Sequence, residues 1–88
     1  LTVGNMNAPT KLVTTIRSFC RASAEFGAED YTTTETLHAD GRIETHCVGY
    51  SDGSNVNERG SRHAGKALDL AAIAEGRKGM GYRIVSLA

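Results

Sequence analysis

One short turn constrains the fold of this chain more than any other feature of its sequence. Asp40-Gly41 lies between two runs rich in β-branched and aromatic residues, 31–37 and 43–50, an arrangement typical of a β-hairpin. Side chains alternate across a strand, so the length of the connecting loop decides which residues share a face. The turn therefore predicts a hairpin whose two faces follow from its loop length.

Two loop lengths can be compared by the faces that they produce. A two-residue Asp40-Gly41 turn places Leu37 beside Glu44 and mixes polar with apolar residues. A three-residue loop, 39–41 with Gly41 in the left-handed bulge position, separates the two kinds. We therefore predict the longer loop, with an apolar face of Tyr31, Thr33, Leu37, Ile43 and Cys47 and a solvent-facing side of Thr34, Thr36, His38, Arg42, Glu44 and His46.

Helical patterns flank this hairpin. Thr10 is suited to cap a helix over about 11–26, in which apolar residues recur at three- and four-residue spacings before Gly27. After a loop over 51–60, Ser61 is suited to cap an alanine-rich helix over about 62–76. Residues 82–87 then predict a final strand.

These elements predict an α+β fold with the order α-β-β-α-β. We expect a small two-layer domain in which two helices pack on one face of a three-stranded mixed sheet. The crossover through the second helix would place the last strand parallel to a hairpin strand. Eighty-eight residues are enough for one domain, which we assign to 10–88, with 1–9 as a flexible arm or short edge strand.

Charge is balanced overall but unevenly distributed. Ten cations offset ten acids, which argues against a general nucleic-acid binder. Residues 25–52 hold seven acids and one cation, whereas the segments before and after them are each net positive by three. The chain contains no apolar run near the ~20 residues needed to cross a bilayer and no opening signal segment, so we expect a soluble, cytoplasmic protein without membrane contact.

No residues with catalytic or metal-binding spacing stand out. The two cysteines, Cys20 and Cys47, fall on the predicted apolar faces, which favours buried thiols over a disulfide. The three histidines are too scattered to predict a metal site, the C-terminal glycines follow a helix instead of opening one, and the serines lack an identifiable base. We therefore predict no enzyme activity and no cofactor.

Two segments resemble known families. Ser61, His63, Gly65, Ala67 and Asp69 are similar in order to the zinc-binding signature of D,D-peptidases that cleave bacterial cell-wall peptides, although the spacing after His63 is one residue shorter and no further histidine follows. The predicted element order also resembles the double-stranded RNA-binding domain, apart from the final strand and the presence of only two strands before the second helix. That resemblance implies phosphate contacts from Arg59, Arg62, His63 and Lys66.

We therefore expect a non-enzymatic interaction protein that regulates or inhibits a larger protein or assembly, as accessory subunits and phage-encoded inhibitors of host defence do. The predicted contact surface comprises Glu35, Glu44, Asp52, Asn55, Asn57, Glu58 and Arg59. The alternative is local binding of double-stranded nucleic acid by the basic N-terminal turn of the second helix, through Arg59, Arg62, His63 and Lys66. Homodimerisation through an exposed edge strand is left open.

Overall fold

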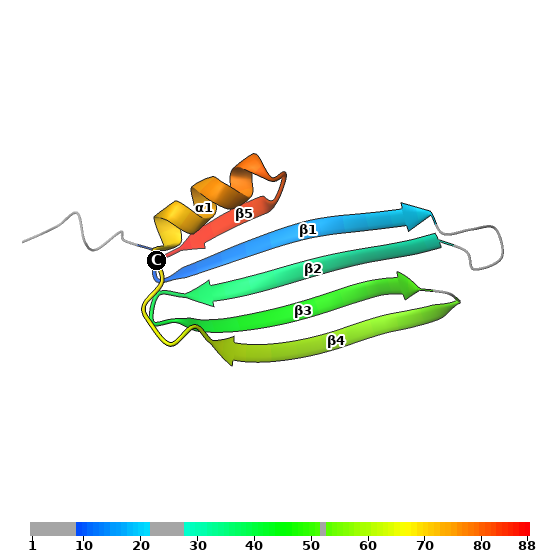
Figure 1. Cartoon of the computed structure of the whole chain (residues 1–88), viewed down its shortest axis with the longest axis horizontal. Helices are drawn as coiled ribbons and strands as arrows, with labels where there is room; N and C mark the ends of the chain where they lie inside the picture. The colour runs from blue at the N-terminus through cyan, green and yellow to red at the C-terminus, as the bar shows by residue number, and fades with distance from the viewer. Residues whose placement is uncertain (1–8, 22–27, 52) are drawn as a thin grey trace, which may run out of the picture.

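The computed structural model describes residues 9–21, 28–51 and 53–88, which form a five-stranded antiparallel sheet and a helix (Figure 1). The elements are β1 (Lys11–Arg21), β2 (Ala28–His38), β3 (Arg42–Ser51), β4 (Ser54–His63), α1 (Leu70–Gly79) and β5 (Arg83–Leu87). The spatial order is β4-β3-β2-β1-β5. The first four strands therefore form a meander, and β5 returns to the opposite edge beside β1.

The prediction of a first helix is wrong, because residues 11–21 form β1 and pair with β2. The three- and four-residue spacing of apolar side chains coincides here with a β-branched run, 13–16, that suits a strand better than a helix. Leu12 is fully buried, whereas Phe19 is 62% exposed, so the predicted helical stripe is not a buried face. The predicted cap, Thr10, instead donates its backbone N–H to the Leu87 carbonyl at 2.9 Å.

The predicted second helix, over about 62–76, begins too early in the chain. Most of the predicted loop over 51–60, together with 61–63, forms β4, and α1 begins only at Leu70. Gly65 has a φ of +80°, which interrupts any helix at this point. The cap is Asp69, whose side chain accepts from the Ala72 N–H at 3.1 Å, and not the predicted Ser61.

The hairpin prediction is confirmed in its register. Leu37 lies opposite Ile43, and Thr33 lies opposite Cys47, as the three-residue loop requires. Gly41 has a φ of +107° and donates its N–H to the His38 carbonyl at 2.9 Å. The left-handed conformation at this position explains why the sequence uses glycine.

The last strand occurs where it was predicted, but its neighbour is different. β5 pairs antiparallel with β1, at the far edge from β4, and not parallel with a hairpin strand. The predicted mixed three-stranded sheet with two helices is therefore wrong. Once β1 and β4 are strands, every adjacent pair in the sheet is antiparallel.

The core lies at one end of the sheet, under α1. Its buried members are Leu12, Leu37, Ile43 and Leu70, which come from β1, β2, β3 and the helix. α1 contacts β1 and β5, and Ile73 and Ile84 pack against the edge of this cluster. Figure 1 shows α1 beside β5 and β1, and among the described residues α1 is the one element outside the sheet, so the opposite face has no covering element.

Two expectations about the chain concern residues outside this core. The predicted N-terminal arm, 1–9, lies outside the described residues apart from Pro9. Within the described ranges, α1 falls well short of the length and hydropathy that a membrane-crossing helix requires.

Candidate functional site

The face of the sheet opposite α1 is called here the outer face. It consists of the odd-numbered residues of β1, β4 and β5 and the even-numbered residues of β2 and β3, because paired residues of adjacent strands point to the same side. The other side, called the inner face, carries the core residues Leu12, Leu37 and Ile43. The outer face is therefore free to contact a partner without disturbing the core.

Charge is sorted between these two faces. Among the strand residues whose side chains the structure describes, the outer face holds five cations and two acids, a net charge of plus three with neutral histidines. The inner face holds one cation and three acids. The outer-face charges are Lys11, Arg17, Arg42, Arg59 and Arg83, with Asp30 and Glu44. A neutral chain thus presents a basic surface on its uncovered side.

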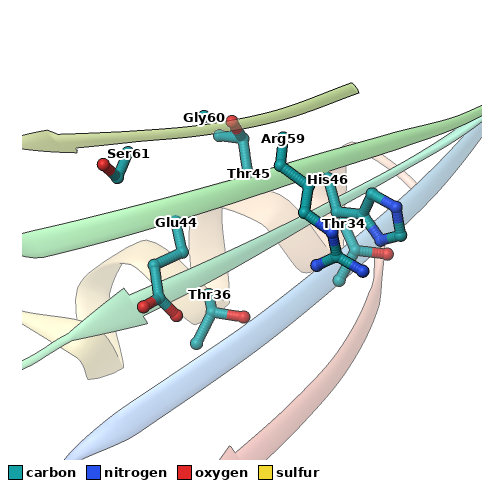
Figure 2. A pocket seen from close by; sticks show the side chains of 8 residues that line it. All are labelled: Thr34, Thr36, Glu44, Thr45, His46, Arg59, Gly60 and Ser61. Carbon is teal, nitrogen blue, oxygen red and sulfur yellow. The ribbon is translucent and has the colours of Figure 1, made fainter. Parts of the chain in front are cut away.

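A hollow of about 720 Å³ lies on the outer face over β2, β3 and β4. Figure 2 shows Arg59, His46 and Thr34 together at one end of the hollow, with Glu44 and Thr36 toward the other. The remaining lining residues are Thr45, Gly60 and Ser61. Its lining offers a guanidinium, an imidazole, hydroxyls and one carboxylate, which suits a polar or anionic segment of a partner.

Two hydrogen bonds hold polar side chains in position around this hollow. His46 Nε2 lies 2.7 Å from Asn57 Oδ1, which links β3 to the edge strand β4. Thr15 and Thr34 place their hydroxyl oxygens 3.2 Å apart and so link β1 to β2. Both contacts are between cross-strand neighbours, and they fix the orientation of these side chains relative to the sheet.

An ion pair with two hydrogen bonds lies on the outer face, toward the end of the sheet away from α1. Arg17 donates to Asp30 from Nε at 2.9 Å and from Nη2 at 2.6 Å. The hydrogen bonds from Arg17 lower the pKa of the Asp30 carboxyl, and the same contact raises the pKa of Arg17. Phe19 and Tyr50 flank Asp30 in the register and are 62% and 45% exposed. This end therefore combines a fixed guanidinium with two exposed aromatic rings.

The opposite end, beside the hairpin loop, carries a second polar group. His38 Nε2 lies 3.4 Å from Glu44 Oε2, and Arg42 Nη2 lies 3.3 Å from His38 Nδ1. Asp40 accepts from the Arg42 N–H at 3.0 Å, and this backbone hydrogen bond lowers the pKa of the Asp40 carboxyl. Glu44 is thus the one predicted acidic residue that the described structure places on the outer face, and its side chain is 52% exposed.

Glu35, a member of the predicted contact surface, is not on the outer face. It lies on the inner face, where Arg77 of α1 donates to it and Arg62 Nη2 lies 3.5 Å away. Arg77 also donates to the fully buried Thr14 hydroxyl at 2.8 Å and lies over the Tyr82 ring, 5.2 Å from its centroid. Glu35 is 15% exposed and therefore serves to attach the helix to the sheet.

The other predicted protein-contact residues are divided between the two faces. Asn55, Asn57 and Arg59 lie exposed on the outer side of β4, and of these Arg59 lines the hollow together with Glu44. Glu58 is exposed on the inner side of the same strand. Asp52 lies outside the described residues. Because side chains alternate along the strands, the acids of the predicted contact surface are divided between the two faces, and the cations predominate on the outer face.

The residues of the nucleic-acid alternative do not form a helical turn. Arg59, Arg62 and His63 are in β4, and Lys66 is in the connection to α1. Alternation along the strand places Arg59 and His63 on the outer face and Arg62 on the inner face. His63 Nδ1 accepts from the Gly65 N–H at 2.9 Å. The basic helix N-terminus on which that alternative depended is absent from residues 59–66.

Sequence reasoning missed the contribution of β1 and β5 to the outer face. Arg17 and Phe19 were assigned to a helix, and Arg83 was not connected to any surface. The signal that could have found them is the run Val13-Thr14-Thr15-Ile16, whose β-branched residues indicate a strand. Reading β1 as a strand would have placed Arg17 and Phe19 on one face by alternation.

The prediction of two buried thiols can be compared with the structure only at Cys47. Cys47 is a free, half-buried thiol on the inner face, 3.7 Å from the Thr33 hydroxyl that donates to it. The side chain of Cys20 lies outside the described part of the structure. No group of three or more His, Cys, Asp and Glu side chains within the described ranges is arranged to hold a metal ion.

The geometry of the outer face is suited to binding. Arg59 and Arg83 offer exposed guanidinium groups, the hollow offers hydroxyls and an imidazole, and two aromatic rings are exposed at one end. Comparison with protein-family models, curated proteins and solved structures gives no match to this chain.

Proposed function

We propose that this protein is a non-enzymatic binding module that covers part of a larger protein with the outer face of its sheet, and thereby regulates or inhibits that protein. The observation that carries the proposal is the sorting of charge, with cations concentrated on the face that no described element covers. The partner surface is expected to be acidic, because complementary charge directs association.

The composition of the outer face supports a protein partner. Arginine, tyrosine and phenylalanine are enriched at the centres of protein interfaces, and this face carries Arg59, Tyr50 and Phe19. Val48 and Val85 add exposed apolar area between the polar side chains. The zero net charge of the whole chain also fits a local protein contact better than a general affinity for phosphates.

A strand of nucleic acid is the second candidate for this face. Phe19 and Tyr50 lie on either side of Asp30, beside the fixed guanidinium of Arg17. Exposed aromatic rings on a sheet can stack on unpaired bases, while neighbouring cations contact the phosphates. This candidate replaces the duplex-binding alternative, whose helical turn is not formed.

The proposal is tested by charge reversal on the outer face. Arg59→Glu combined with Arg83→Glu is compared with a control that makes the same charge change elsewhere, Lys66→Glu combined with Lys78→Glu. Each tagged protein is used to capture partners from lysate of the source or its host, with and without nuclease. We expect the outer-face variant to lose a stoichiometric protein that both the wild type and the control retain.

The two candidates give different outcomes in this experiment. A protein partner that survives nuclease treatment and depends on Arg59 and Arg83 supports the proposed function. Material that depends on these residues but is released by nuclease would instead support binding of nucleic acid. Equal capture by all three proteins would show that the outer face is not the binding surface.

A further inference from the structure

The edge strand β4 carries three charged side chains, Glu58, Arg59 and Arg62, but lacks other features that keep sheet edges from pairing. It has ten residues, Ser54–His63, and pairs with β3 without a bulge from Ser51↔Ser54 to Arg42↔His63. The strand contains neither proline nor lysine. Among the described residues no strand lies on its other side, so β4 forms an edge of the sheet (Figure 1). A long, regular edge of this kind is a template for another strand.

The register with β3 determines which backbone groups of β4 are available. Ala64 donates its N–H to the Gly41 carbonyl at 2.9 Å, so this position belongs to the hydrogen-bonded set of pairs. In an antiparallel ladder these pairs alternate with non-hydrogen-bonded ones. The even-numbered residues of β4 therefore bond to β3, and the odd-numbered residues 55–63 direct their N–H and C=O groups toward the free edge.

A second copy of the chain can pair with this edge only in certain registers. A two-fold axis perpendicular to the sheet places β4 antiparallel to its copy, with odd-numbered residues opposite odd-numbered ones. When Gly60 lies opposite Gly60 of the second copy, Glu58 lies opposite Arg62 of that copy, and the symmetry produces this pair twice. Glu58 and Arg62 are both exposed on the inner face. Arg62 Nη2 also lies 3.5 Å from Glu35 Oε2, but its side chain remains 60% exposed and can reach a neighbour.

Neighbouring registers are less favourable by the same reasoning. Centring the pairing on Arg59 places two guanidinium groups opposite each other, and centring it on Glu58 places two carboxylates opposite each other. Centring it on Ser61 places Arg59 opposite His63 and leaves Glu58 without a charged counterpart. The pairs formed by Glu58 and Arg62 in the Gly60 register are of the non-hydrogen-bonded type, in which cross-strand side chains lie closest.

We propose that the chain forms a symmetric homodimer through β4, in the register centred on Gly60, with reciprocal Glu58–Arg62 pairs. The dimer continues the sheet from one copy into the other and brings the two outer faces side by side. It does not depend on what the outer face binds, because the pairing uses the backbone edge and inner-face charges.

Charge reversal within the proposed pair gives the first test. The dimer dissociation constant is measured by sedimentation velocity for the wild type, Glu58→Arg, Arg62→Glu and the double variant. Each single variant turns two attractions into two repulsions, and we expect the constant to rise roughly tenfold or more. The double variant restores both pairs with reversed sign and should return to within about threefold of the wild type.

Matched controls carry the same charge changes on the exposed surface of α1. Glu75→Arg and Lys78→Glu should leave the dissociation constant within about twofold of the wild type, because both residues lie away from β4. A wild-type protein that remains monomeric up to about millimolar concentration would overturn the proposal. So would a double variant that associates no better than the single ones.

Cysteine pairing tests the register directly and does not depend on charge. In a background of Cys20→Ser and Cys47→Ser, a mixture of Glu58→Cys and Arg62→Cys proteins should form a disulfide-linked dimer under mild oxidation. Neither protein alone should do so, because each cysteine then lies about four residues from its copy along the strands. A mixture of Val56→Cys and Arg62→Cys, which the register centred on Arg59 would join, is the control. Preferential linkage of that control mixture would refute the proposed register.

Discussion

At the scale of single residues, Arg77 links the helix to the sheet. It donates to the buried Thr14 hydroxyl at 2.8 Å and to Glu35. Replacing Arg77 with alanine removes the hydrogen-bond donor that both of these groups share. We expect Arg77→Ala to lower the free energy of unfolding by about 1–3 kcal/mol, with Arg62 partly compensating Glu35. Urea denaturation measures this loss. Lys78→Ala, at the exposed neighbouring position, should change stability by less than about 0.5 kcal/mol, and an equal effect of both changes would contradict the assignment.

The Arg17–Asp30 pair is a second residue-scale feature with a measurable consequence. Hydrogen bonding to Arg17 lowers the pKa of Asp30, so the pair stabilises the fold fully above the ordinary pKa of an aspartate and loses this contribution as the pH falls through the lowered value. Titration of the Asp30 carboxyl followed by NMR should show its pKa rising in Arg17→Ala. The pKa of Asp40 is lowered mainly by the backbone N–H of Arg42 and should stay unchanged in the same variant. An unchanged Asp30 titration would contradict the pairing.

At the scale of elements, the hairpin loop depends on Gly41. Its φ of +107° is unfavourable for any residue with a Cβ, and a Cβ placed there would collide with the Lys66 carbonyl and lie 2.7 Å from His63 Cε1. We expect Gly41→Ala to destabilise the protein by about 2 kcal/mol or more. The measurement is the midpoint of thermal unfolding followed by circular dichroism.

A glycine substitution in α1 serves as a control, because there alanine is expected to stabilise the protein. Gly76 lies inside the helix, and a Cβ added there meets nothing within 4 Å. Gly76→Ala should therefore stabilise the protein by about 0.5–1 kcal/mol, because alanine is the better helix former. Destabilisation by both substitutions would show that the loss at position 41 does not report on the loop.

At the scale of the whole molecule, stability is concentrated at the end of the sheet that α1 covers. Leu12 is fully buried there among residues from β2, β3 and the helix, whereas much of the sheet has no covering element among the described residues. We expect Leu12→Ala to cost about 2–5 kcal/mol, a large share of the stability of a small domain. Val85→Ala, on the outer face where the side chain is 47% exposed, should cost less than about 1 kcal/mol. Similar losses in chemical denaturation would refute this distribution.

The sequence by itself determined the local features of the fold. The Asp40-Gly41 turn and the alternation around it set the hairpin register, and residues 83–87 form a strand as their pattern predicts. These features follow from backbone preferences and from side-chain alternation between near neighbours in the chain. The outward positions of Glu44 and His46 were predictable for the same reason.

Only the tertiary structure decided the identity of β1 and β4 and hence the candidate site. β4 alternates weakly, and its hydrogen bonds come from β3, so an isolated segment of this composition gives little sign of a strand. In β1, apolar residues are spaced as in a helix, but backbone pairing with β2 on one side and β5 on the other holds the segment as a strand. Because a strand is completed by its neighbours, the placement of Arg17, Phe19 and Arg59 on one basic face was settled by pairing between strands and not by local sequence.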